Sequence, residues 1–424
     1  MQDLIPPHGG LSEPVDRTVP EAEAAEFRRE ARGWKALSIN DADLSSLYRM
    51  GDGGLSPLTG PMNREVFERA LNEEVVLHEG KAYAWTIPVA FPVEKNLGGS
   101  LKLGEMTALV NSAGEIVGSL EVQDVYPWDK ARYIRGVYGT DRTDHPGGHM
   151  IMDDPREMLV GGEIRALPQP KNPQYGRFVL SPRQTRALFR ERGWERVVAF
   201  QTRNPLHRAH EYALVVGMER LTRDGHFAGA VLNPLIGETK GDDVDAATRM
   251  RTYQALIDNR ALGEGDKDEA LWNKVGYDLN DQILLLGLDI KMFYAGPKEA
   301  IMHAIYRQNF GFTDIVIGRK HADAPFDDRT DIWDAMAAQR KFDELNGVLK
   351  IKPVKVGFAA FYEELGRVGL VEEYAPKGYN QVAISGRELR EQLRSGLLPD
   401  SRVMRPETSE ILRDSMRAKE AVGV

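Results

Sequence analysis

The sequence contains no cysteine among its 424 residues. This absence excludes thiol nucleophiles, disulfide bonds, thiolate-bound iron–sulfur clusters and zinc sites with thiolate ligands. A chain without cysteine also fits a reducing compartment. We therefore expect no protein-bound zinc and a cytoplasmic location.

Long hydrophobic runs are also missing. The longest one, Ile283 to Leu288, includes Gly287 and ends at Asp289, and a bilayer span needs about 20 apolar residues. The first ten residues, MQDLIPPHGG, show no basic stretch followed by an apolar one. We therefore expect no signal peptide and no membrane partner.

Positive charge is in deficit, because 55 Lys and Arg residues face 64 Asp and Glu residues, for a net charge of −9. A chain this acidic is a poor general binder of nucleic acid, although a local basic pocket can still hold an anion. No GxxxxGK[ST] loop occurs, which excludes a P-loop kinase domain. The composition, 42% hydrophobic and 28% charged, is ordinary for a globular protein of two or three domains.

The first part of the chain, residues 1–168, has the patterns of a strand-rich domain. Aromatic and β-branched residues at 82–93 predict a strand, and 107–128 predicts two strands around a turn. A helix is expected at Arg64 to Asn72. The stretch from Arg165 to Gly176 carries three prolines and predicts a linker.

Residues 169–328 alternate between helical and strand patterns. Helices are expected at 182–192, from Glu211 onwards, at 246–259 and at 297–309, and strands at 194–200, 228–233, 282–288, 291–296 and 313–318. This alternation predicts a parallel α/β sheet. Residues 329–424 keep a mixed α/β character, and a Ser385 to Glu388 capping box starts a helix there.

Three of the predicted strands run directly into loops rich in polar residues, glycine or histidine. These loops are 201–210, 234–243 and 319–323. In open parallel sheets, ligands bind beyond the carboxyl ends of the strands. We therefore expect the three loops to converge on one pocket.

The first loop is the richest in functional side chains. His207 and His210 are three residues apart, so at a helix start they share a face beside the free N–H groups and the positive end of the helix dipole. Arg203 adds a planar fork suited to oxyanions. Together they favour a phosphate or sulfate site, whose candidates are Gln201, Thr202, Arg203, Asn204, His207 and His210. For the histidine pair alone, the alternative is two partly buried, hydrogen-bonded rings.

The second loop places Lys240 between Thr239 and Gly241, followed by Asp242 and Asp243. A lysine in such a loop can reach phosphates, and the two carboxylates can hold Mg²⁺ through water. The alternative is a solvated turn.

In the third loop, Arg319, Lys320 and His321 follow Gly318 directly. Three cationic or potentially cationic groups at a strand end favour a polyanion, with a basic surface turn as the alternative. Lys298, in the first turn of a predicted helix, is a further possible anion contact.

The segment QTRNPLHRAH resembles the Q-x-R-N-P-x-H-x-x-H signature of the ATP sulfurylase (sulfate adenylyltransferase) family. A chance match to this many ordered motifs is implausible, because the similarity covers most of the chain. The other matching segments are Pro6 to Gly10, Leu55 to Met62, Trp85 to Val89, Tyr138 to Gly148, Tyr294 to Gly311 and Ile384 to Glu407.

The resemblance implies an α/β protein of three domains. It implies a β-rich, PUA-like domain at 1–168, a Rossmann-like nucleotidylyltransferase domain with a parallel sheet at 169–328, and a small α/β domain at 329–424. It also implies that ATP and sulfate react to adenosine 5′-phosphosulfate and pyrophosphate, with Mg²⁺ arriving on ATP. A homodimer or larger homo-oligomer is expected.

The resemblance also assigns roles to single residues. Gln201, Arg203 and the Ala322 backbone are expected to bind sulfate, and Thr202, Arg203 and Asn204 to form the catalytic run. His207 and His210 are expected to contact the phosphates and stabilise the transition state. The nucleotide-binding residues are expected to be Gln201, Thr202, Arg203, Asn204, Gly318, Arg319, Lys320 and His321.

The chain departs from the family pattern at the third loop. Where the family has G-R-D-H-A-G, Lys320 replaces an acid and Asp323 replaces a glycine. The changed charge is expected to affect nucleotide affinity or the favoured direction. Residues 261–278 look like extra acidic surface with no assigned role. Two alternative functions stay open: adenylyl transfer to a phosphate ester, and a catalytically silent sensor of sulfate or nucleotide.

Overall fold

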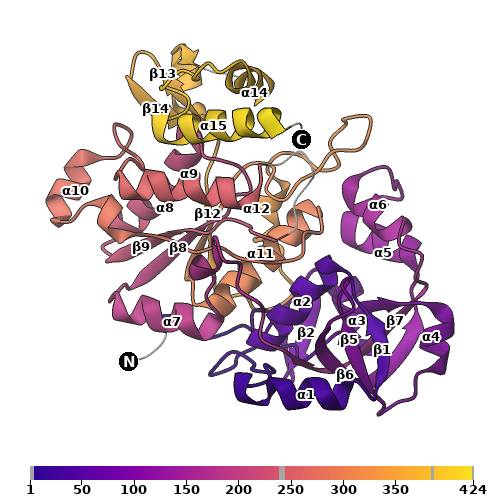
Figure 1. The fold of residues 1–424 in the computed structure, drawn as a ribbon. Coiled ribbons are helices and arrows are strands. Elements are labelled where there is room, and N and C mark those ends of the chain that lie inside the picture. Colours follow the sequence, from indigo (N-terminus) through magenta and orange to yellow (C-terminus); the bar gives the residue numbers. More distant parts are fainter. Residues whose placement is uncertain (1–3, 238–243, 383–385, 423–424) are drawn as a thin grey trace.

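The computed structural model describes residues 4–237, 244–382 and 386–422. An N-terminal region lies beside a central α/β region, and a smaller C-terminal region covers the far side of the central one (Figure 1). Lys240, Asp242, Asp243 and Ser385, on which sequence predictions fall, lie outside the described residues.

The N-terminal region is built on a five-stranded sheet of order β1-β5-β6-β7-β4. β1 is parallel to β5, and the other pairs are antiparallel. The two strands and the turn predicted within 107–128 are confirmed, because β5 and β6 pair as an antiparallel hairpin. The strands are β1 (Lys35–Ser38), β4 (Phe91–Val93), β5 (Met106–Val110), β6 (Ile116–Pro127) and β7 (Met158–Ala166), with a separate hairpin of β2 (Val75–His78) and β3 (Lys81–Ala84).

Short helices pack around this sheet. Asn63 accepts a hydrogen bond from the Val66 N–H and so begins α3, which confirms the helix predicted at Arg64. The strand predicted at 82–93 is wrong as one element, because its two ends pair with different partners as β3 and β4. The helices are η1 (Glu21–Glu23), α1 (Ala24–Ala31), α2 (Asp41–Asp52), α3 (Arg64–Glu73), α4 (Lys95–Ser100), α5 (Lys130–Tyr138) and α6 (Pro146–Met152).

The central region holds a five-stranded sheet of order β10-β9-β8-β11-β12, in which all neighbours are parallel. This confirms the predicted parallel α/β sheet. The sheet extends past residue 328, the predicted end of the central domain, because β12 pairs with β11. The strands are β8 (Arg196–Phe200), β9 (Ala228–Leu232), β10 (Ile283–Leu285), β11 (Asp314–Ile317) and β12 (Lys352–Lys355).

Both faces of the parallel sheet are covered, which explains why its strands are apolar throughout. Side chains such as Val198 and Val316 pack with α8 and α9 on one face. Their neighbours Val197 and Ile315 pack with α7 and α11 on the other, in a core continuous with that of the N-terminal region. The helices are η2 (Gly176–Phe178), α7 (Pro182–Glu191), α8 (Arg208–Arg223), α9 (Ala246–Asp258), α10 (Glu269–Val275), η3 (Leu279–Gln282), α11 (Gly296–Phe310) and α12 (Ala337–Lys341).

One predicted strand, 291–296, is wrong. Its backbone N–H groups at Phe293 and Ala295 donate to the Glu299 carboxylate, at 3.0 and 2.9 Å, instead of to a neighbouring strand. A buried side chain has therefore taken the hydrogen bonds that a strand ladder would need. Tyr294, between the two donors, has a positive φ of 55°.

The C-terminal region is mixed, as expected. An antiparallel sheet of order β14-β13-β15 packs on α8, and α15 packs on α9. Figure 1 shows α15 in yellow across the outer side of the central helices. The elements are β13 (Ala359–Tyr362), β14 (Arg367–Leu370), α13 (Val371–Tyr374), η4 (Ala375–Lys377), β15 (Gln381–Val382), α14 (Gly386–Arg394) and α15 (Pro406–Val422).

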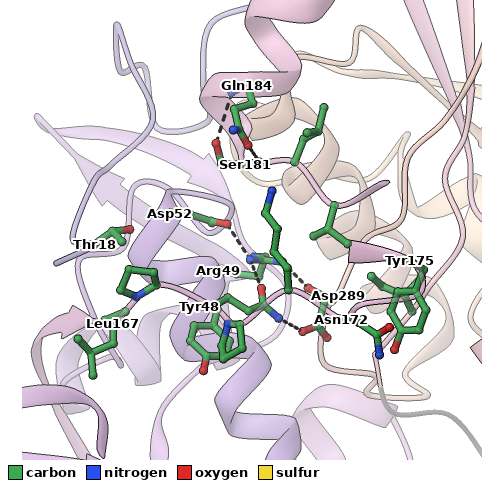
Figure 2. A pocket seen from close by; sticks show the side chains of 18 residues that line it. Thr18, Tyr48, Arg49, Asp52, Leu167, Asn172, Tyr175, Ser181, Gln184 and Asp289 are labelled. Carbon is green, nitrogen blue, oxygen red and sulfur yellow. Dashed lines mark hydrogen bonds and ion pairs between the residues drawn. The ribbon is translucent and has the colours of Figure 1, made fainter. Parts of the chain in front are cut away.

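A cavity of about 310 Å³, here called the interdomain cavity, lies between α2 of the N-terminal region, the predicted linker and the central region. Figure 2 shows Arg49 on its wall between Asp52 and Asp289. The Arg49 guanidinium pairs with Asp52 at 2.7 Å and donates to the Asp289 carbonyl and the Gln169 side chain at 3.0 and 2.8 Å. This buried network joins the two regions.

Candidate functional site

A second cavity, of about 390 Å³, lies at the carboxyl ends of β8, β11 and β12 and is here called the central cavity. The first and third loops converge on it, as expected. The second loop contributes Leu235 among its described residues. The site residues that the family resemblance predicts all line the central cavity: Gln201, Thr202, Arg203, Asn204, His207, His210, Gly318, Arg319, Lys320, His321 and Ala322.

The first loop is held by its own hydrogen bonds. The Thr202 hydroxyl donates to the Asn204 carbonyl at 2.9 Å and accepts from the Asn204 N–H at 3.1 Å. Tyr253 of α9 donates to the same carbonyl at 2.8 Å. The Thr202 hydroxyl therefore stabilises the conformation of the loop, in which the neighbouring Arg203 lines the cavity.

His207 and His210 lie at the first turn of α8. The helix begins at Arg208, earlier than predicted, because the His207 ring caps it and accepts the His210 N–H at Nδ1, 3.4 Å away. When neutral, His207 must then carry its hydrogen on Nε2, where it can be donated to a ligand oxygen. The two rings stack with centroids 3.7 Å apart.

Burial keeps both rings neutral. It lowers the pKa of His207 to about 4, and burial together with the neighbouring His207 lowers the pKa of His210 to about 3. At neutral pH the pair therefore offers N–H donors without a full positive charge.

Positive charge at the cavity comes from arginine. The Arg203 guanidinium carbon lies 5.8 Å from the centre of the Tyr294 ring, and that of Arg319 lies 4.3 Å from the centre of the Phe358 ring. Neither arginine forms an ion pair within the described part of the chain. Their N–H donors remain available for an anion, because an aromatic face binds a guanidinium without using them.

The third loop turns sharply. Lys320 and Ala322 have positive φ angles of 51° and 56°. The Lys320 ammonium pairs with Asp331 at 2.6 Å, and both side chains are partly exposed. Asp323 lines the cavity and has one buried oxygen without a partner among the described residues. Burial raises the pKa of the Asp323 carboxyl.

His321 is not a cation like its neighbours Arg319 and Lys320, contrary to expectation. Burial and the nearby His303 and Arg307 lower its pKa well below the usual value for histidine. Its Nε2 lies 3.0 Å from Nδ1 of His303, a buried residue of α11. His321 is therefore a neutral hydrogen-bonding ring at neutral pH.

Two other expectations are wrong. Lys298 is not an anion contact of the central cavity, because it donates to the Gly136 carbonyl and pairs with Glu74 at 2.6 and 2.7 Å. The segment 261–278 is not merely acidic surface, because Asp266 is buried within it. Asp266 accepts from Arg208, at the start of α8, at 2.6 Å and from the Val368 N–H at 2.8 Å.

Sequence reasoning missed several residues that line the cavity. The sequence predicts a strand around Tyr294 and indicates no role for Phe358. Each of these two rings lies against the guanidinium of an arginine, and both rings and both arginines line the same cavity. An aromatic residue in an apolar stretch is a weak signal, because most such residues pack in the core.

Comparison with known proteins decides the family. A model described as ATP-sulfurylase matches residues 176–415, and a model described as PUA-like domain matches residues 5–169. The chain belongs to the ATP sulfurylase family. The comparisons confirm the predicted family, the predicted α/β fold class and the prediction that the protein is a nucleotidyltransferase.

Curated relatives match over nearly the whole chain. A sulfate adenylyltransferase of Pyropia yezoensis is 50% identical over 422 residues, which is 99% of each chain. A sulfate adenylyltransferase of Synechococcus sp. (strain JA-3-3Ab) is 34% identical, over 98% of each. Among solved structures, a hexameric APS kinase from Thiobacillus denitrificans superposes with a TM-score of 0.70 at 22% identity, covering 97% of this chain and 68% of that one. The last likeness concerns the fold.

Two absences within the described ranges concern metal binding and membrane insertion. No group of three or more His, Asp or Glu side chains in them is arranged to hold a metal ion. None of their helices combines the length and apolar character needed to cross a bilayer.

Proposed function

We propose that the central cavity catalyses the reaction of ATP with sulfate to adenosine 5′-phosphosulfate and pyrophosphate. The observation that carries this proposal is the pair of arginines, Arg203 and Arg319, held over aromatic rings without carboxylate partners among the described residues. They line one cavity with the neutral histidines at the N-terminus of α8. Family membership and the names of the full-length relatives support the same activity.

The chemistry needs little from the protein beyond positioning and positive charge. Sulfate is already a dianion, so no general base is required. A sulfate oxygen attacks the α-phosphorus in line as the bond to the bridging oxygen of pyrophosphate breaks. The main obstacle is the approach of two anions, and preorganised donors lower it.

The site residues divide between the two substrates. Gln201, Arg203 and the Ala322 backbone hold sulfate, and Thr202 and Asn204 shape the catalytic loop that carries Arg203. His207 and His210 donate to phosphate oxygens and stabilise the transition state. The nucleotide is held by the first loop, Gln201 to Asn204, together with Gly318, Arg319, Lys320 and His321.

Mg²⁺ enters with ATP, held mainly by phosphate oxygens and water. We further propose a cytoplasmic enzyme that acts as a homodimer or larger homo-oligomer. The absence of cysteine supports the location.

Pyrophosphate release from Mg-ATP, measured with and without sulfate and with inorganic pyrophosphatase present, tests the activity. We expect sulfate-dependent release. If release is absent and adenosine 5′-phosphosulfate plus pyrophosphate also yields no ATP, the proposal is wrong. Release that depends on a phosphate ester in place of sulfate would assign a different acceptor.

A further inference from the structure

Three side chains form a row behind the central cavity, from the interior of α11 to the third loop. Glu299 and His303 lie one turn apart on α11 and are 0% and 1% exposed. His303 Nε2 lies 3.4 Å from Glu299 Oε1, and His303 Nδ1 lies 3.0 Å from His321 Nε2. The two rings meet edge to face, with centroids 5.3 Å apart. Of the three residues, His321 lines the cavity.

The backbone around Glu299 determines where the hydrogens of this row lie. The Glu299 carboxylate accepts the Phe293 and Ala295 N–H groups, so it acts as an acceptor toward its neighbours. His303 therefore satisfies it only with a hydrogen on Nε2. A bare Nε2 would set two lone pairs against each other at 3.4 Å.

The next hydrogen follows from the first. Burial lowers the pKa of His303 although the neighbouring Glu299 carboxylate acts in the opposite direction, and Arg307 adds to the lowering. The ring therefore carries one hydrogen at neutral pH. With that hydrogen on Nε2, His303 Nδ1 is bare and accepts. His321 must then donate from Nε2, and because this ring is also neutral, its Nδ1 is bare.

Gln201 is compatible with this arrangement. Its amide lies 3.5 Å from His303 Nε2, at the outer limit of a hydrogen bond. Its Oε1 is buried and has no partner among the described residues. A half turn of the amide exchanges its oxygen and nitrogen, and presents that oxygen to the His303 N–H as a second acceptor.

The remaining nitrogen of the row is accessible from the cavity. His321 Nδ1 has no hydrogen-bond partner within the described residues. It is also not fully buried, unlike the unpartnered polar atoms in the interior of the protein. A bare ring nitrogen repels the lone pairs of a phosphate oxygen but accepts from a hydroxyl or amino group.

We propose that Glu299 and His303 are positioning residues that hold His321 as a neutral ring protonated at Nε2, so that its Nδ1 accepts a hydrogen bond from a hydroxyl or amino group of the nucleotide. The identity of that ligand as a nucleotide rests on the proposed function. Arg319 then supplies the anion contact of the third loop, and His321 binds the uncharged part of the same molecule.

The tautomer is tested directly, without turnover. The protein is labelled with ¹⁵N-histidine, and its two-bond proton–nitrogen correlations are recorded at pH 7 without nucleotide, with His321→Asn to assign the signal. We expect His321 bare at Nδ1 and protonated at Nε2 in the wild type, and a mixture of tautomers in His303→Leu. A wild-type ring protonated at Nδ1, or an unchanged tautomer in His303→Leu, overturns the inference whether or not the protein activates sulfate.

Kinetics separate positioning from packing. Asn at position 303 can place its oxygen where Nδ1 was and accept from His321, whereas Leu cannot. We expect His303→Leu to raise the KM for ATP about tenfold with a smaller change in kcat, and His303→Asn to stay within about threefold of wild type. Met302→Leu, equally buried on the same helix, is the control for packing. Equal losses in all three variants, with matching losses of Tm, assign His303 a purely structural role.

Discussion

The two cavities use arginine in opposite ways. In the interdomain cavity, Arg49 is paired with Asp52 and bound to the Asp289 carbonyl, so its charge is neutralised within the protein (Figure 2). In the central cavity, Arg203 and Arg319 rest on aromatic faces. An arginine that holds domains together uses its donors on the protein, whereas one that binds an anionic substrate keeps them available.

The largest expected effect comes from removing a free guanidinium. Arg203→Ala should lower sulfate-dependent pyrophosphate release by a factor of ~100 or more, because a preorganised donor to the reacting anions is lost. The protein should stay folded, which thermal unfolding would check. Arg203→Lys should lie between wild type and Ala, because it keeps the charge but loses the planar fork. Normal turnover of Arg203→Ala would show that the site is wrongly assigned.

The opposite outcome is expected for the paired arginine. Arg49→Ala leaves the Asp52 carboxylate largely buried without its partner and should lower the free energy of unfolding by about 3–5 kcal/mol. Urea denaturation measures this. Arg49→Met combined with Asp52→Asn should recover part of the loss, since no unpaired charge remains. If Arg49→Ala unfolds like the wild type but loses activity, Arg49 does not stabilise the fold and acts in the function of the protein instead.

A buried histidine where the N-terminal and central regions meet should make the free energy of unfolding depend on pH. His8 is fully buried, its ring donates to the Ala84 carbonyl at 2.9 Å, and its backbone N–H donates to Asn309 of α11 at 2.8 Å. Burial lowers its pKa to about 4. The unfolded chain therefore binds a proton below about pH 6.5 that the folded chain does not. The stability that the neutral His8 ring contributes is fully retained above that pH and is lost as the pH falls toward 4.

The expected loss attributable to His8 is about 2 kcal/mol between pH 6.5 and pH 5. His8→Gln keeps an N–H donor for the Ala84 carbonyl and removes the titration. Urea unfolding of the wild type and of His8→Gln at the two pH values isolates the contribution of His8, because His207 and His210 contribute equally to the pH dependence of both proteins. An equal pH dependence in the two proteins would contradict the assignment.

The smallest effect is expected at the residue that departs from the family pattern. Lys320 pairs with Asp331 at the partly exposed rim of the cavity. Lys320→Asp, which restores the family's acid, should change the KM for ATP by less than about tenfold and leave stability nearly unchanged, because exposed ion pairs contribute little. A loss as large as that of Arg203→Ala would place Lys320 among the main contacts of the substrate.

Local patterns predicted most of the central sheet. Ser181 and Pro182 begin α7, with Gln184 completing the capping box, and the apolar run before residue 201 became β8. The segment 291–296 misled because it is as apolar as a strand, while the carboxylate that takes its N–H groups lies on the following helix. Nothing in the local pattern reveals that Glu299 is buried and turned back toward that segment.

The amino-acid sequence is enough to show which chemical groups the protein has for an anion site, and in which loops they lie. Strand alternation placed those loops at one sheet edge, and the absence of cysteine limited the chemistry. The charge and the hydrogen positions of those groups, in contrast, depend on the folded structure. The neutral rings of His207 and His321, the positioning row from Glu299 through His303, and the role of Asp266 depend on burial and on partners distant in the chain. Desolvation and long-range pairing set the charge of a side chain, and neither is encoded by its neighbours in sequence.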